Sequence, residues 1–94
     1  VHSNGTHPNY DHGIYLTTGG NLIEESDFYN NAAYGIHLYN GGAKIVSNNT
    51  IRNNRSFNNN RLKTGGAGII ISSGANNLVY NNIIFGNSDG IMVQ

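Results

Sequence analysis

Residues 77–93 read NLVYNNIIFGNSDGIMV, and this stretch decides the fold. It holds two apolar triplets, Leu78–Tyr80 and Ile83–Phe85, and a further apolar string that begins at Gly90. Apolar runs this short, separated by asparagine and glycine, are typical of three-residue β-strands joined by tight turns. Asparagine and glycine suit those turns because they tolerate a left-handed backbone.

The same pattern recurs at fixed spacing along the chain. Four strings begin with Gly-Ile: Gly13–Leu16, Gly35–Leu38, Gly68–Ile71 and Gly90–Val93. The first two strings are 22 residues apart, the last two are also 22 apart, and the middle pair is 33 apart. A repeat of about 22 residues, with an insertion of about 11 residues in one copy, explains this spacing.

A second motif, N-x-I-x-x-N-x-I-x-x-N, lies between these strings. It runs over residues 21–31, 44–54 and 77–87. In this alignment one asparagine column contains Asn4, Asn31, Asn54 and Asn87, and the apolar column before it contains Val1, Phe28, Ile51 and Ile84. We expect the asparagines to stack as ladders at turns, so that Asn4 and Asn54 are turn residues although each begins an N-x-[ST] sequon.

These columns predict an all-β parallel solenoid. A helix is excluded by the wrong period and by the frequent glycine and asparagine, and an antiparallel sandwich would not keep a 22-residue register. An asparagine-rich disordered segment is the alternative, and the fixed apolar columns argue against it. The repeat resembles the right-handed parallel β-helix repeats of the pectin-lyase-like superfamily, over nearly the whole chain.

We therefore predict one β-helix segment over residues 1–94, with about four coils. Residues 1–12 form an initial loop and partial coil, 13–34, 35–67 and 68–89 form coils with an insertion at 55–67, and 90–94 form the last strand. Neither end carries a polar cap. We expect a fragment of a longer solenoid, or ends covered by another copy.

Composition excludes several classes of protein. Five basic and five acidic residues cancel, which argues against nucleic-acid binding. The chain has no cysteine, no apolar run long enough to span a bilayer and no signal peptide. An extracellular or periplasmic location is implied by the resemblance alone.

The Gly-Ile strands predict a candidate binding face. Alternation turns Tyr15, His37, Ile70 and Met92 outward in one column, and Thr17, Tyr39, Ser72 and Gln94 in the next. Tyr15, His37 and Tyr39 would then cluster over neighbouring coils, and aromatic rings with a polar tip suit sugar binding. The resemblance implies that a polysaccharide would lie along this face.

The candidate catalytic residues are His37, Asp11 and His12. His37 is a candidate general base or sugar ligand, or alternatively an ordinary surface residue. Asp11 and His12 weakly resemble the acid-histidine strings of alginate epimerases, but the spacing keeps Asp11 from reaching His37. Arg55, Arg61 and Lys63, assigned to the insertion, would meet an anionic sugar carboxylate or would remain ordinary solvated cations. Residues 1–12 and the insertion enter at the same turn, so both should flank one edge of the face.

The sites that such enzymes need are incomplete here. Asp11 and Asp89 flank the face three coils apart, about 14 Å, and glycosidases need a closer acid pair. No metal site is predicted, because the spacing of His2, His7 and His12 matches no ligand motif. No cofactor is evident, and Ca²⁺ is implied by family analogy only.

Two functions stay open. The first is an extracellular module that binds or processes a polysaccharide, for example a uronate-containing one. If it is an enzyme, its activity would resemble that of a polysaccharide lyase, glycoside hydrolase or epimerase. The second is a non-catalytic module that assembles end to end with further copies.

Overall fold

The computed structural model describes residues 1–7, 9–42, 45–62 and 65–94. These residues form ten short β-strands, and no helix among them is long and apolar enough to cross a membrane. The strands are β1 (Ile14–Leu16), β2 (Leu22–Glu24), β3 (Asp27–Tyr29), β4 (Ile36–Leu38), β5 (Thr50–Arg52), β6 (Arg55–Phe57), β7 (Ala67–Ile71), β8 (Leu78–Tyr80), β9 (Ile83–Phe85) and β10 (Asp89–Val93).

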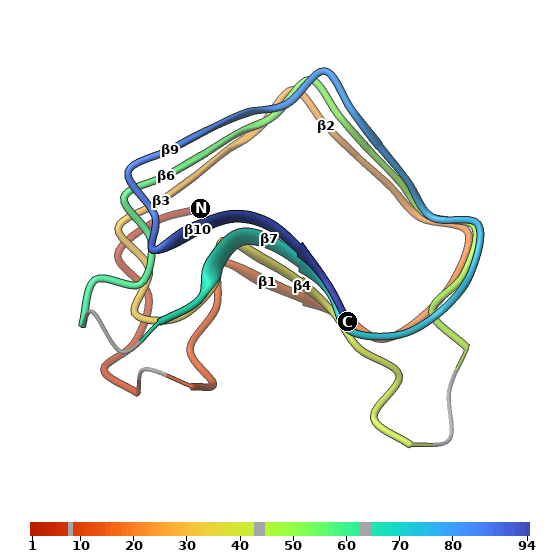
Figure 1. Ribbon diagram of the computed structural model, residues 1–94, viewed down its shortest axis with the longest axis horizontal. Helices are drawn as coiled ribbons and strands as arrows, with labels where there is room; N and C mark the ends of the chain where they lie inside the picture. The colour runs from red at the N-terminus through yellow and green to blue at the C-terminus, as the bar shows by residue number, and fades with distance from the viewer. Residues whose placement is uncertain (8, 43–44, 63–64) are drawn as a thin grey trace.

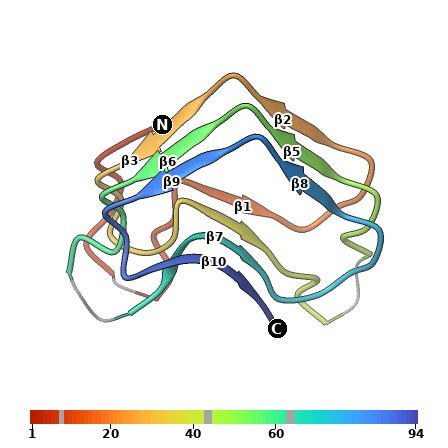
Figure 2. The same cartoon turned by 45° about the horizontal axis from the view of Figure 1, so that its top comes forward.

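The strands form three parallel sheets, which lie as three sides around a common interior (Figure 1). The strand orders are β1-β4-β7-β10, β2-β5-β8 and β3-β6-β9. Neighbouring strands come from successive turns of the chain, which Figure 2 shows lying one behind the other. The predicted parallel solenoid is confirmed.

The register of the sheet β1-β4-β7-β10 agrees with the sequence alignment. Tyr15 pairs with His37, His37 with Ile70, and Ile70 with Met92, so the predicted column is confirmed, although Ile70 is only 1% exposed. Ile36 and Leu38, on either side of His37, are fully buried. The candidate binding face is therefore the outer face of this sheet.

The predicted alignment of the other two sheets is wrong by five residues in the second coil, whereas the predicted column of Phe28 and Ile84 is confirmed, since both align with Ser56. Ile51 pairs with Ile23 and Val79 rather than sharing a column with Phe28, which instead pairs with Ser56. The physical reason is that N-x-I-x-x repeats after five residues within each coil. A slip of one half-motif therefore matches apolar residues to apolar residues almost equally well.

The predicted insertion at 55–67 is also wrong in part. Arg55–Phe57 form strand β6, in register with β3 and β9. The extra residues of this coil are divided between two turns: residues 39–49 separate β4 from β5, and residues 58–66 separate β6 from β7. Residues 17–21 and 30–35 make the equivalent connections in the preceding coil.

Asparagine ladders hold the turns together, as predicted, but their membership differs. The Oδ1 of Asn49 accepts hydrogen bonds from the main-chain N–H and the Nδ2 of Asn21, at 2.9 and 3.0 Å. Three ladders are built from rungs of this kind: Asn4–Asn31–Asn59–Asn87, Asn21–Asn49–Asn77 and Ser26–Asn54–Asn82. Asn4 and Asn54 are both ladder residues, and Asn54 belongs to the last of these ladders rather than the first.

The residue before each ladder position has a left-handed backbone. It is asparagine at positions 30, 48, 53, 58, 76 and 81, with φ between 51° and 60°, and glycine at positions 20 and 86. These residue types bear that conformation at the lowest cost. Glu25, with φ of 52°, and Ser3, with φ of 57°, are the departures from the pattern.

The core is a column of stacked apolar side chains, aliphatic except for Phe28. Its buried members are Ile23, Phe28, Ile36, Leu38, Val46, Ile51 and Ile69. Full burial of each such side chain stabilises the fold by about 1.5–3 kcal/mol. Val46 comes from the turn 39–49, so the longer turn also contributes to the interior.

Candidate functional site

A hollow lies over the first two coils of the sheet β1-β4-β7-β10. Its volume is about 330 Å³, and it is lined by Asn9, Tyr10, His12, Tyr15, His37 and Tyr39. Tyr15 and Tyr39 leave 48% and 42% of their surface exposed, whereas His37 is half-buried between them. The predicted cluster of Tyr15, His37 and Tyr39 is thus brought together, and the loop before β1 adds a wall.

A second hollow adjoins the first along the same face. Its volume is about 310 Å³, and it is lined by Tyr34, His37, Tyr39, Ile70, Ser72 and Gln94. His37 and Tyr39 belong to both hollows. Together the two hollows form one groove across the outer face of the sheet, and we call it the aromatic groove.

His12 contacts His37 directly, a contact that the sequence interpretation did not include. His12 precedes β1, and its ring stacks on Tyr34 with centroids 5.0 Å apart and planes 18° apart. It meets the His37 ring edge-on, with centroids 4.6 Å apart. The 22-residue step between His12 and Tyr34 carried the signal, since it places them at equivalent positions of successive coils.

A directed chain of hydrogen bonds links these side chains. The main-chain N–H of Tyr34 donates to His12 Nδ1 at 3.2 Å. His12 Nε2 lies 3.0 Å from His37 Nδ1, and His37 Nε2 lies 3.1 Å from Ser72 Oγ. We call these four groups the histidine relay.

The main chain fixes the direction of the histidine relay. A main-chain N–H can only donate, so His12 Nδ1 has no hydrogen, and the neutral ring carries its hydrogen on Nε2. That Nε2–H donates to His37 Nδ1, which in turn leaves the His37 hydrogen on Nε2, facing Ser72 Oγ. Ser72 Oγ therefore accepts, and its own hydrogen is free to donate to another group.

Both imidazoles are held neutral. Burial, followed by the nearby His12, lowers the pKa of His37 to about 4. Burial also lowers the pKa of His12, although the charge of Asp11 opposes this. At neutral pH the groove consequently presents two uncharged rings.

This direction disfavours Ser72 as a nucleophile. A serine is activated when a histidine nitrogen accepts its proton, but here His37 Nε2 already carries a hydrogen and donates to Ser72. A general-base role for His37 meets the same obstacle. The arrangement suits the donation and acceptance of hydrogen bonds to a bound ligand.

Asp11 organises its own loop. Its Oδ2 accepts the main-chain N–H groups of Thr6 and His7 at 2.9 and 2.8 Å. Those two hydrogen bonds hold the pKa of the Asp11 carboxyl below its usual value. The carboxylate thus shapes the wall of the groove, and its hydrogen bonds do not extend to His37.

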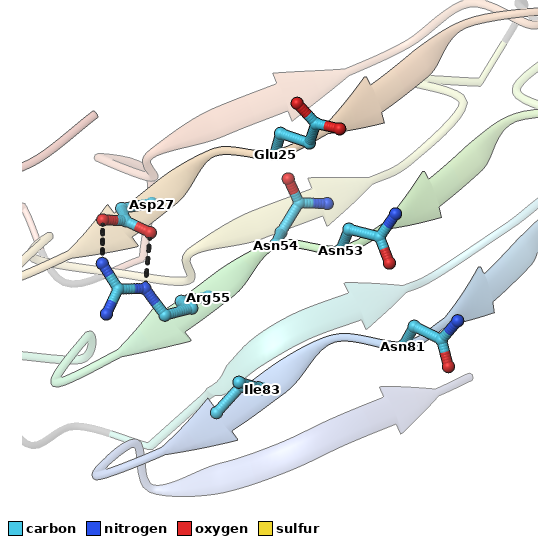
Figure 3. Close-up of a pocket in the computed structure, with 7 residues that line it drawn as sticks. All are labelled: Glu25, Asp27, Asn53, Asn54, Arg55, Asn81 and Ile83. Atoms are coloured by element: carbon cyan, nitrogen blue, oxygen red, sulfur yellow. Dashed lines mark hydrogen bonds and ion pairs between the residues drawn. The ribbon is translucent and has the colours of Figure 1, made fainter.

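The structure places neither Arg55 nor Arg61 among the residues that line the aromatic groove. Arg55 lies on the outer face of the sheet β3-β6-β9, where it forms a bidentate pair with Asp27 at 2.8 and 2.6 Å (Figure 3). Its assignment to the insertion is wrong because of the five-residue slip. Lys63 lies outside the described residues.

Arg61 joins two loops. Its guanidinium donates to the carbonyl oxygens of Asn30, at 3.1 Å, and of Asn4, at 3.3 Å, and it also contacts the carbonyl oxygen of Gly5. The N-terminal loop and the β6–β7 loop therefore meet at one edge of the groove, as predicted. The described hydrogen bonds of Arg61 all belong to this junction.

Another hollow, of about 420 Å³, shares no lining residue with the aromatic groove (Figure 3). It is lined by Glu25, Asp27, Asn53, Asn54, Arg55, Asn81 and Ile83. Three of its polar side chains are already engaged, since Asp27 and Arg55 pair with each other and Asn54 belongs to a ladder. We assign this hollow to the corner between two sheets and base no function on it.

A stack of rings on the sheet β3-β6-β9 differs from the groove. His2, Tyr29, Phe57 and Phe85 lie nearly parallel, with centroids 4.7–5.0 Å apart and planes within 10°. Each inner ring is covered on both faces by its neighbours. In the aromatic groove the angles are mixed: Tyr15 lies at 51° to His37, whereas Tyr39 lies at 17° to His37 with centroids 5.9 Å apart.

Within the residues that the structure describes, no group of three or more histidine, cysteine or acidic side chains is placed to hold a metal ion. His2 stacks on Tyr29, His7 stacks on Tyr10, and His12 bonds to His37, so the histidines of the N-terminal loop disperse. His12 is also a poor metal ligand. Its Nδ1 accepts the main-chain N–H of Tyr34, so the hydrogen of the neutral ring must lie on Nε2. A metal ion bound at Nε2 would displace that hydrogen and leave it no place on the ring.

Comparison with known proteins bears on the fold. No curated protein and no solved structure matches the chain. A family model described as a right handed beta helix region matches residues 1–94. Together with the three parallel sheets, this match shows that the chain belongs to the right-handed β-helix family.

Proposed function

We propose that this protein binds a polysaccharide or oligosaccharide in the aromatic groove. The observation that carries the proposal is the cluster of Tyr15, His37 and Tyr39, whose two tyrosines remain 48% and 42% exposed in a hollow on the outer face of the sheet. Open ring faces pack on the apolar side of a sugar, and tyrosine hydroxyls at their edges pair with sugar hydroxyls. The proposal carries with it an extracellular or periplasmic location.

Binding, rather than cleavage or epimerisation, is the activity we propose. Among the described residues, no carboxylate side chain lines either half of the groove, and glycoside hydrolysis requires two. The direction of the histidine relay also leaves no side-chain nitrogen of His37 free to accept a proton. His37 can take part in hydrogen bonding to a ligand without a neighbouring carboxylate and without a ring nitrogen that is free to accept a proton.

A polysaccharide array screen with matched tyrosine variants tests this proposal. Tyr39 and Tyr80 are both 42% exposed, but Tyr80 lies on β8, in a different sheet. Removal of one aromatic platform should cost about 0.5–1.5 kcal/mol, so Tyr39→Ala should weaken binding by roughly 3- to 10-fold. Tyr80→Ala should leave affinity unchanged, and equal losses in both variants would refute the location.

Stacking against another β-helix coil is the second candidate. Ile83, Phe85 and Ile91 expose 58, 50 and 49% of their surface on β9 and β10. A further coil packed there would cover them and pair the strands. Sedimentation over a range of concentrations tests self-association: a mass that rises with concentration would favour this candidate, and a constant monomeric mass would remove it.

A further inference from the structure

We propose that the aromatic groove selects neutral sugars and rejects uronates. This inference rests on the proposed function and names the class of ligand for the same site. Its basis is the direction of the histidine relay together with the residues that surround it.

The histidine relay resists protonation at both rings. A proton added to His12 would have to enter at Nδ1, which accepts the main-chain N–H of Tyr34. A proton added to His37 would enter at Nδ1, which accepts the Nε2–H of His12. Either step replaces a hydrogen bond with two hydrogens that face each other, so the pair cannot become a cation without local rearrangement.

Among the residues that the structure describes, the remaining lining offers no charged partner either. Besides the two histidines, the described side chains that line the groove come from asparagine, glutamine, serine, tyrosine and isoleucine. The described arginines are engaged elsewhere, since Arg55 pairs with Asp27, Arg52 pairs with Glu24, and Arg61 binds main-chain carbonyl groups. A uronate carboxylate in the groove would thus lose water without gaining a cation from any of these residues, and this desolvation is costly.

A neutral sugar fits the same surface. Its apolar face would pack on Tyr15 or Tyr39, which are exposed over 48 and 42% of their surface. Ser72 accepts from His37 and so presents its hydroxyl hydrogen to a sugar oxygen. These hydrogen bonds are satisfied by hydroxyl groups and require no charge on either partner.

Matched polysaccharides test the inference. Polygalacturonate, polymannuronate and polyglucuronate would each be compared with the carboxyl-reduced form of the same chain, alongside neutral glucans, mannans, xylans and galactans. Calorimetry on the 94-residue chain would be run at low and high salt. We expect any chain that binds in both forms to bind about tenfold more tightly when reduced, with affinity nearly independent of salt.

The outcomes separate the inference from the function on which it rests. Tighter binding of any uronate than of its reduced form, or affinity that falls steeply with salt, would overturn the inference and leave the binding proposal standing. Failure of every polysaccharide to bind would overturn the binding proposal and the inference with it. Tighter binding of the neutral forms would support both.

Imidazole nitrogen NMR at neutral pH supplies a second test that needs no ligand. His12 and His37 should both carry a single hydrogen, on Nε2. A hydrogen on Nδ1 of His12, or a doubly protonated His37, would overturn the charge argument. His7 serves as a control, because it lies outside the histidine relay.

Discussion

Removal of the Asn59 side chain should destabilise the fold far more than removal of an exposed asparagine. Asn59 is 3% exposed, and its Oδ1 accepts the side chain and the main-chain N–H of Asn31 at 2.8 and 3.3 Å. Its Nδ2 donates to the carbonyl oxygen of Phe28 and to Ser56 Oγ. Asn59→Ala therefore strands two donors on Asn31, which is fully buried.

The size of the loss follows from these contacts. A buried donor left without a partner costs about 1–3 kcal/mol, and the 3.3 Å bond counts for little, so we expect about 2–4 kcal/mol in total. The melting temperature should fall by roughly 10–25 °C in a domain of this size. Urea denaturation measures the free energy of unfolding directly, with Asn9→Ala as the exposed control. A loss below about 0.5 kcal/mol in Asn59→Ala would refute the ladder reasoning.

Three further predictions concern a turn, the pH and a loop. Glu25 and Asn53 both have a left-handed backbone, which asparagine bears at lower cost than glutamate. Glu25→Asn should therefore raise the free energy of unfolding by about 0.5–1 kcal/mol, and Asn53→Glu should lower it by a similar amount. Urea denaturation that finds Glu25→Asn no more stable than the unmodified chain, or Asn53→Glu no less stable, would contradict this. Because the pKa of His37 falls to about 4 in the folded chain, the contribution of its neutral ring to the free energy of unfolding should be fully present above pH 6.5 and be lost as the pH falls toward 4. After allowance for partial exposure, we expect the free energy of unfolding to fall by about 1–2 kcal/mol over this range. A His37→Gln variant that shows the same dependence on pH would contradict this prediction. Arg61→Gln removes the contacts that join the N-terminal loop to the β6–β7 loop, so amide hydrogen exchange should become faster at Thr6 and stay unchanged in the sheets. Unchanged exchange at Thr6 would show that Arg61 does not hold the N-terminal loop in place.

The fold was predictable because its strongest signal is long-range. Gly-Ile strings recur at 22 and 33 residues, and no local pattern can imitate such spacing. The register of the other sheets was not predictable in the same way, because their motif repeats after five residues. The strand pairing resolves this ambiguity by placing Ser56 beside Phe28, and hydrophobicity alone would not choose a serine for that position.

The candidate site was predictable where it follows from alternation. Tyr15 and His37 face outward because every second residue of a strand does, and the structure agrees. The contact between His12 and His37 depends instead on how the turn before β1 is bent, which residue types do not determine. The error over Arg55 was inherited from the slipped register rather than from a separate misreading of charge.

The second coil is longer than its neighbours, yet the aromatic groove that crosses it is preserved because the added residues come between the strands and not within them. Tyr15, His37 and Ser72 come from three successive coils, so they align only if β1, β4 and β7 stay in register. The extra residues of the second coil come between β4 and β5 and between β6 and β7, and the register of β4 with β7 is unchanged. One residue added within β4 would instead reverse the faces of its side chains, burying His37 and exposing its apolar neighbours. Insertions or deletions after Tyr39, in the connection between β4 and β5, can therefore reshape the rim of the groove while the histidine relay stays intact.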